Sequence, residues 1–237
     1  MKSLISKFFG GGFSKFARSE MTANSAIVSQ ALEDPWFPVL VSFPRTGSHW
    51  LRMMMELYFD RPTLVRAFYF LQSRDYLAFH THDLDLKTQR KSVIYLYRDP
   101  VDTVYSQLKY HGRSLDDAEA MQQWCVLYGK HLSKWMIGDC YSERKTIITY
   151  ERLRNSLWEE FGCVVEHFGK ELDKQKLASV ANQVTRDEVK DRTRHDPQVI
   201  SRERTYSESR EEFRNSYGAK VLDLVLAQDK GLGRYIG

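Results

Sequence analysis

The chain has 237 residues, of which 42% are hydrophobic, 13% aromatic and 28% charged, a composition that supports a sizeable core and excludes a disordered or collagen-like protein. Its 35 basic and 31 acidic side chains give a formal charge of +4, which suits an anionic ligand but is too small to indicate nucleic-acid binding. Three cysteines without pairing or metal-ligand spacing predict neither a disulfide framework nor a metal site, and they favour the reducing cytoplasm.

The first 34 residues differ from the rest of the chain. Lysine and phenylalanine side chains alternate around three glycines at 10–12, which would interrupt both a helix and the apolar stretch of a signal peptide. One interpretation is an arm that contacts an anionic membrane surface or a partner protein, and the more ordinary one is a partly ordered terminus. Because no apolar run approaches the roughly 18 residues of a membrane span, we expect a cytoplasmic protein with at most a peripheral membrane contact.

Residues 35–237 are predicted to form one α/β domain. Helical patterns run through 50–58 and, after a cap at Asp116 or Asp117, from Met121 to Trp135. Buried strands separated by helices predict a central parallel sheet flanked by helices, with ligands at the carboxyl ends of the strands. The predicted strands are 37–43, 76–81, 92–97 and 145–150.

The segment 43–50, Phe-Pro-Arg-Thr-Gly-Ser-His-Trp, joins the first strand to the first helix of this domain. Backbone N–H groups at a helix start, a glycine that permits a tight turn, the hydroxyl of Ser48 and the cation of Arg45 can together hold an anion. The spacing is not that of a Walker A loop. A turn of this composition is common between a strand and a helix, so the segment is weak evidence when taken alone.

A second strand-to-helix junction carries Arg98, Asp99 and Pro100, with Ser106 eight residues after the arginine. Pro100 suits the first turn of a helix. One interpretation is that Arg98 and Ser106 bind the same phosphate across the side of that helix. The alternative is a structural arginine paired with Asp99 or Asp102.

Together the two segments resemble the signature of the PAPS-dependent sulfotransferases, YPKSGTxW followed by a strand ending in R-[ND]-P and a serine eight residues after the arginine. The resemblance implies a P-loop-like strand-loop-helix motif that binds the phosphosulfate of 3′-phosphoadenosine 5′-phosphosulfate (PAPS), with adenosine 3′,5′-bisphosphate (PAP) as product. It extends in order from about residue 37 to 235: residues 80–84 stand where the family has K-T-H-L-P, and 150–153 where it has Y-E-D-L.

The resemblance also implies roles for individual residues. His82 would be the general base, with His80 and Asp83 as alternatives, and a purely structural histidine remains the competing interpretation. Arg45 would stabilise the departing phosphate, and Ser106 would contact Arg45 before the acceptor arrives and so restrain idle hydrolysis of the donor. The residues expected to bind the donor are Arg45, Thr46, Gly47, Ser48, His49, Trp50, Arg98, Ser106 and Tyr150.

The sequence departs from the family pattern at three places. Arg45 replaces a lysine, which keeps the charge but changes a point cation into a planar fork. His49 replaces a threonine. The late family loop R-K-G-x-x-G-x-W is not recognisable, and Arg202 and Arg204, in a mixed-charge stretch, are the candidates for a second hold on the 3′-phosphate. A solvated helix and loop explains those two arginines equally well.

The expected reaction is transfer of the sulfuryl group by in-line displacement to a hydroxyl on a glycan or small molecule, with an amine acceptor left open. It needs no metal, and no nucleic-acid partner is expected. A P-loop-type nucleotide kinase or hydrolase is the enzymatic alternative, although it would want a Gly-Lys-[Ser/Thr] loop end. A catalytically silent nucleotide-binding adaptor, peripheral to a membrane, is the alternative from a different class.

Overall fold

A computed structural model of the chain describes residues 20–21, 25–138, 142–193 and 206–236. Most of the arm predicted at 1–34 lies outside these residues, so its contact with lipid or a partner stays a prediction. The described part of the arm contributes β1 (Glu20–Met21), which pairs antiparallel with β3 (Arg66–Ala67), and the helix α2 (Ser25–Glu33). No helix in the described ranges is both long and apolar enough to cross a membrane.

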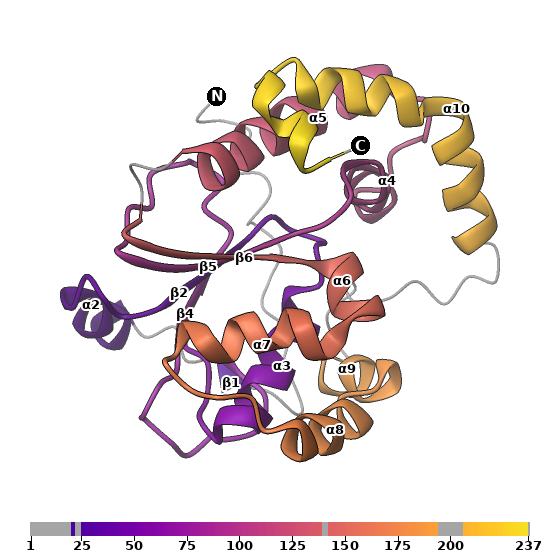
Figure 1. Ribbon diagram of the computed structural model, residues 1–237. Helices are drawn as coiled ribbons and strands as arrows, with labels where there is room; N and C mark the ends of the chain where they lie inside the picture. The colour runs from indigo at the N-terminus through magenta and orange to yellow at the C-terminus, as the bar shows by residue number, and fades with distance from the viewer. Residues whose placement is uncertain (1–19, 22–24, 139–141, 194–205, 237) are drawn as a thin grey trace.

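Four parallel strands form the centre of the molecule in the order β4-β2-β5-β6 (Figure 1). The prediction of a parallel sheet flanked by helices in a single domain is confirmed. The strands are β2 (Val39–Ser42), β4 (Phe79–Thr81), β5 (Ser92–Tyr97) and β6 (Arg144–Thr149).

Two strands are shorter than their sequences predict. The strand expected at 76–81 starts only at Phe79, because the backbone before it bonds elsewhere: Leu77 N–H donates to the Pro62 carbonyl and Leu64 N–H donates to the Ala78 carbonyl. The strand expected at 37–43 is reduced to 39–42, although the Pro38 carbonyl still accepts from the N–H of Phe79 at the start of β4. The strand expected at 145–150 ends one residue early, since Tyr150 begins a helix.

Helices cover both faces of the sheet (Figure 1). One core contains Val39, Val41, Val93 and Tyr95, and the other contains Leu40, Ile94, Leu96 and Ile148, so successive residues of a strand face opposite layers. The first layer comprises α4 (Pro100–Tyr110), α5 (Ala118–Leu132) and α10 (Tyr206–Leu226); the second comprises α3 (Ser48–Phe59), α7 (Leu157–His167), α8 (Lys174–Gln183) and α9 (Arg186–Arg192).

The end of the predicted 121–135 helix differs in geometry from its start. Asp117, one of the two expected caps, accepts a hydrogen bond from Ala120 N–H at 2.9 Å and begins α5. The helix then widens into the π-helical turn η1 (Ser133–Ile137), which places Lys134 and Trp135 inside the protein. The remaining elements are the short helix α6 (Tyr150–Asn155) and the 3₁₀ turn η2 (Lys230–Arg234).

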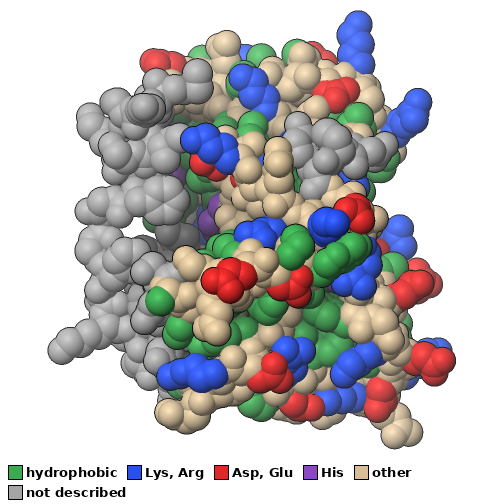
Figure 2. Space-filling view, turned by 90° about the vertical axis from the view of Figure 1, so that its left-hand side faces the viewer, with side chains coloured by type: hydrophobic (Ala, Val, Ile, Leu, Met, Phe, Trp, Pro, Cys, Tyr) green, Lys and Arg blue, Asp and Glu red, His purple; other side chains and the backbone are tan. Residues whose placement is uncertain are grey.

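Charges of both signs are interspersed on the face shown in Figure 2, without a broad basic area among the residues described there. The basic side chains that are described on this face are therefore dispersed among acidic ones.

Candidate active site

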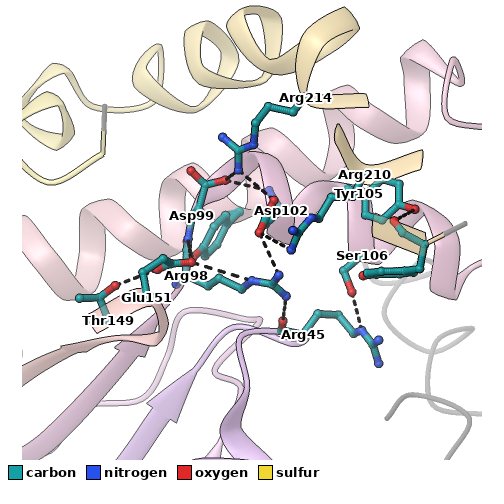
Figure 3. Close-up of polar contacts among 12 residues, drawn as sticks. Arg45, Arg98, Asp99, Asp102, Tyr105, Ser106, Thr149, Glu151, Arg210 and Arg214 are labelled. Carbon is teal, nitrogen blue, oxygen red and sulfur yellow. Dashed lines mark hydrogen bonds and ion pairs between the residues drawn. The ribbon is translucent and has the colours of Figure 1, made fainter. Parts of the chain in front are cut away.

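The two segments singled out in the sequence lie side by side, because they follow the neighbouring strands β2 and β5. An Arg98 guanidinium N–H donates to the Arg45 carbonyl at 3.4 Å, and the Gln107 side-chain amide donates to the Pro44 carbonyl at 3.0 Å. Arg45 Nε donates to Ser106 Oγ at 2.9 Å (Figure 3). The sequence expectation that Arg45 and Ser106 meet therefore agrees with the geometry.

The loop before α3 is shaped by two residues in the left-handed region. Arg45 has φ 75° and Gly47, the residue that caps α3, has φ 93°. Thr46 is fully buried and its hydroxyl donates to the Phe43 carbonyl at 2.7 Å, which closes the turn. Gly47 has no side chain that could cap the helix, so the N–H groups of the first turn of α3 are left to bind an anion.

Aromatic residues form a wall beside this loop. Trp50, on α3, meets Tyr150, the first residue of α6, edge to face at a centroid distance of 6.0 Å. The guanidinium of Arg98 lies 4.9 Å from the centre of the Tyr150 ring. The structure thus brings together two rings that the resemblance assigns to donor binding, and Tyr150 lies directly beside Gly47.

Arg98 is held in place from several sides. Its guanidinium contacts Asp102 at 2.9 Å, so the alternative pairing raised from the sequence is present, with Asp102 rather than Asp99. Burial lowers the pKa of Arg98, but the charge and hydrogen bond of Asp102, together with Tyr150 and Tyr206, outweigh burial and the pKa lies above its ordinary value. The Tyr128 hydroxyl donates to the Arg98 carbonyl at 2.7 Å and accepts from its N–H, which fixes the backbone at the tip of β5.

Two arginines that sequence reasoning missed lie next to Arg98. Arg214 contacts Asp99 at 2.7 Å and Asp102 at 2.8 Å, and Arg210 contacts Asp102 at 3.3 Å (Figure 3). Both come from α10, whereas the candidates Arg202 and Arg204 lie outside the described residues. The sequence does contain a signal for this contact. Arg210 and Arg214 are four residues apart and Asp99 and Asp102 are three apart, so each pair lies on one helix face, and the two faces are complementary in charge.

His82 follows β4, on the other side of β2 from Arg98. Its Nδ1 lies 2.8 Å from the Ser42 carbonyl oxygen, which can only accept, so Nδ1 carries the proton and Nε2 holds a lone pair. Burial lowers the pKa of His82, which keeps the ring neutral at physiological pH. His131 Nε2 donates to the His82 carbonyl at 3.0 Å and Tyr95 bonds the other nitrogen of His131 at 2.9 Å, so the backbone of His82 is also fixed.

The two alternative bases are engaged in structural contacts. Asp83 is buried, and its carboxylate accepts from Lys134 Nζ at 2.6 Å and from Trp135 Nε1 at 3.0 Å. His80 is buried beneath the loop, with Nε2 3.0 Å from Ser42 Oγ and burial holding its pKa well below the ordinary value. The geometry therefore favours His82 over either alternative.

His49 lies in the first turn of α3 with its ring 5.6 Å from Phe68 and its Nε2 3.5 Å from the Arg66 guanidinium. Burial lowers its pKa well below the ordinary value, and the charge of Arg66 lowers it further. His49 is therefore a neutral imidazole beside the loop. Ser48, its neighbour, is nearly buried at the start of the helix.

A parallel sheet with a tight loop and a helix start after β2, an arginine at the tip of β5 and a histidine after β4 defines a P-loop-like α/β protein. Residues 65–220 match the family model described as a sulfotransferase domain. The chain therefore belongs to the sulfotransferase domain family, and the enzyme class predicted from the sequence, a PAPS-dependent sulfotransferase, is confirmed.

Solved structures agree on the fold. The crystal structure of mouse sulfotransferase SULT7A1 complexed with PAP is 17% identical, with a TM-score of 0.55, over 90% of this chain and 92% of that one. Retinol dehydratase in a complex with retinol and PAP is 13% identical, with a TM-score of 0.54, over 83% of this chain and 86% of that one. No curated protein sequence matches the chain significantly. At these identities the likeness establishes the fold.

Proposed function

We propose that the protein transfers the sulfuryl group of PAPS to a hydroxyl acceptor by in-line displacement, with His82 as general base. The observation that carries this proposal is the placement of three groups on three adjacent strand ends: His82 after β4, the anion-binding loop after β2 and Arg98 after β5. A donor with phosphate at both ends of one adenosine matches the two cationic positions, and the histidine lies on the side away from Arg98.

In this proposal the first loop binds the phosphosulfate. N–H groups of residues 46–50 and the guanidinium of Arg45 stabilise the charge that grows on the departing phosphate, and one such preorganised donor is typically worth about 2.7–4 kcal/mol in the transition state. Arg45 is bonded to Ser106 at 2.9 Å. While Arg45 is bonded to Ser106, it does not stabilise the bridging oxygen of the donor, and this is the restraint on hydrolysis that the resemblance implies. The donor would become reactive when Arg45 moves from Ser106 to that oxygen.

The acceptor side depends on the protonation of His82. As the acceptor oxygen bonds to sulfur and the bond from sulfur to the phosphate oxygen breaks, the hydroxyl proton passes to Nε2. The resulting imidazolium is stabilised through Nδ1 by the Ser42 carbonyl, 2.8 Å away. A positioned base of this kind contributes roughly 10²–10⁴ in rate.

The acceptor itself is proposed as an alcohol. The retinol dehydratase structure was determined with retinol, an alcohol, together with PAP, which supports a small hydroxyl compound; a glycan hydroxyl remains the other candidate within this proposal. The cytoplasm remains the expected location.

The test is a thermal-shift titration with PAP and with ATP, followed by an acceptor screen with ³⁵S-labelled PAPS. We expect stronger stabilisation by PAP and transfer of label to an alcohol. Stronger stabilisation by ATP would support the kinase alternative, and stabilisation by PAP without any transfer across a broad set of alcohols and glycans would support the silent adaptor. A His82→Ala variant is expected to bind PAP and to lose turnover.

A further inference from the structure

The cluster beside Arg98 contains three arginines around one carboxylate. Asp102 accepts from Arg98 at 2.9 Å, from Arg214 at 2.8 Å and from Arg210 at 3.3 Å, while Arg214 is also matched by Asp99 at 2.7 Å. These contacts join the end of β5 and the start of α4 to α10 (Figure 3). Three cations thus converge on a carboxylate that carries a single negative charge.

The three arginines are not equivalent. Arg214 bridges two aspartates and Arg98 is the most buried, with 12% of its side chain exposed. Arg210 has 32% of its side chain exposed, and Asp102 is the one carboxylate it contacts among the described residues, at the longest distance in the cluster. Arg210 is therefore the arginine that can change partners at the least cost.

The cluster is continuous with the donor site. Arg98 also donates to the Arg45 carbonyl, and Ser106 lies one helical turn after Asp102 on α4. The beginning of α10 is anchored to the same helix, since the Tyr105 hydroxyl donates to the Tyr206 carbonyl at 3.3 Å. Arg210, one turn further along α10, is in this way presented beside Arg98 and Ser106.

We infer that Arg210 exchanges Asp102 for the 3′-phosphate of the donor, and so supplies the second hold on that phosphate in place of the unrecognised family loop. This inference rests on the proposed function. A phosphate monoester carries close to two charges and three acceptor oxygens, so it competes with a carboxylate for a guanidinium and can bind it through two hydrogen bonds. Asp102 acts as the counter-ion of Arg210 until that phosphate arrives.

The inference predicts selectivity for nucleotides that carry a 3′-phosphate. Isothermal titration calorimetry would compare PAP with adenosine 5′-monophosphate on the wild type and on Arg210→Gln. We expect the variant to bind PAP roughly 10- to 100-fold more weakly, the usual effect of losing a charge-assisted hydrogen bond, with the monophosphate affinity changed less than about twofold. Lys220→Gln, at an exposed position of the same helix, is the matched control and should alter neither affinity.

Two results for Arg210→Gln would overturn the inference while leaving the proposed function in place. One is that the affinities for PAP and for the monophosphate fall by the same factor, and the other is that the affinity for PAP is unchanged. A wild type that binds the two nucleotides equally would instead overturn the proposed function, and the inference with it.

The exchange itself is tested with Asp102→Asn. Removal of the carboxylate charge leaves three arginines without their shared counter-ion, so the variant without nucleotide should have a lower Tm than the wild type without nucleotide. PAP should then raise the Tm of the variant by more degrees than it raises that of the wild type. A smaller rise than in the wild type would show that Asp102 supports phosphate binding rather than competing with it, and would overturn the exchange.

Discussion

Gly47 shows how closely one backbone position controls the first loop. Its φ is 93°, and a Cβ placed there would lie 2.5 Å from Tyr150 Cδ2. Left-handed backbone costs a non-glycine residue roughly 1–2 kcal/mol, and the contact with the ring would add to that cost. The chain therefore needs glycine here both for the turn and for the approach of the aromatic wall.

We predict that Gly47→Ala weakens PAP binding at least roughly tenfold, because displacement of Tyr150 and the loop amides removes more than the roughly 1.4 kcal/mol that corresponds to that factor. Calorimetric titration would measure it. Gly169→Ala is the matched control: its φ is 67° and an added Cβ would meet no atom within 4 Å, so it has the backbone strain without the clash. Equal PAP affinities in the two variants would contradict the role of Tyr150.

The protonation of His82 gives a pH prediction. Burial lowers its pKa, so the free enzyme loses its base only when the pH falls below the ordinary histidine value of about 6.5. The acid limb of kcat/KM for PAPS should therefore lie below about pH 6.5, with activity level above it. The residual activity of His82→Gln should lack that limb. A limb centred at or above the ordinary histidine value would contradict the assignment.

At the level of elements, the loop after β4 is fixed to η1 by a buried ion pair. Asp83 is 0% exposed at its side chain and Lys134 is 5% exposed, with 2.6 Å between Nζ and Oδ2. Asp83 also has φ 42° and immediately follows His82. The widened turn of η1 thus supports the strand end that presents the proposed base.

We expect Lys134→Met to lower the free energy of unfolding by about 3–5 kcal/mol, because it leaves a buried carboxylate without its cation. Lys176→Met removes the exposed pair with Asp60, at 2.5 Å, and should cost no more than about 1 kcal/mol. Urea unfolding would measure both. Similar values for the two variants would show that the buried pair contributes nothing beyond a surface contact.

The elements that the sequence predicted best are those with continuous β-branched or aromatic patterns. The strand at 92–97 is found with its predicted bounds, since both of its faces are buried between helix layers. The strand at 79–81 is cut short by hydrogen bonds to residues 62–64, which are separate in sequence and leave no local signal.

The contribution of α10 could not be predicted from its own pattern. Charges of both signs alternate along it, which resembles a solvated helix, and the importance of Arg210 and Arg214 depends on aspartates more than a hundred residues earlier. The protonated nitrogen of His82 was unpredictable for the same reason, because its acceptor belongs to another strand.

Across the whole molecule, the site draws on both helical layers. The loop amides belong to α3, which packs in the core with Leu40, whereas Asp102 and Ser106 belong to α4, which packs in the core with Val41. A substitution in either core that shifts α3 or α4 would therefore also shift the residues that this helix contributes to the site.

Two buried histidines make the fold sensitive to acid. Burial lowers the pKa of His131 to about 3 and that of His167 to about 4. Between these values and the unfolded pKa of about 6.5 the unfolded chain binds more protons, so stability is complete above about pH 6.5 and is lost as the pH falls toward about 4. Each histidine should contribute a slope of roughly 1.4 kcal/mol per pH unit.

Urea unfolding at several pH values between about 7.5 and 4.5, which span the unfolded histidine pKa, would check this. His167→Gln, in which Gln replaces a ring that bonds Ser92 and Thr146, should unfold with a shallower pH dependence than the wild type. A wild-type stability that stays level across the acid half of that range would contradict the prediction.

The pairing of Arg214 with Asp99 and Asp102 has a consequence for biosynthesis. Among the described residues every strand lies before residue 150, yet Arg210 and Arg214, which contact the start of α4, are translated some sixty residues later. While the ribosome is still adding that stretch, Asp102 has Arg98 as its cation, but neither aspartate has the Arg214 contact. The strands of the sheet would therefore be synthesised before the donor site is complete, and α10 would supply both part of the core and the last cations of that site.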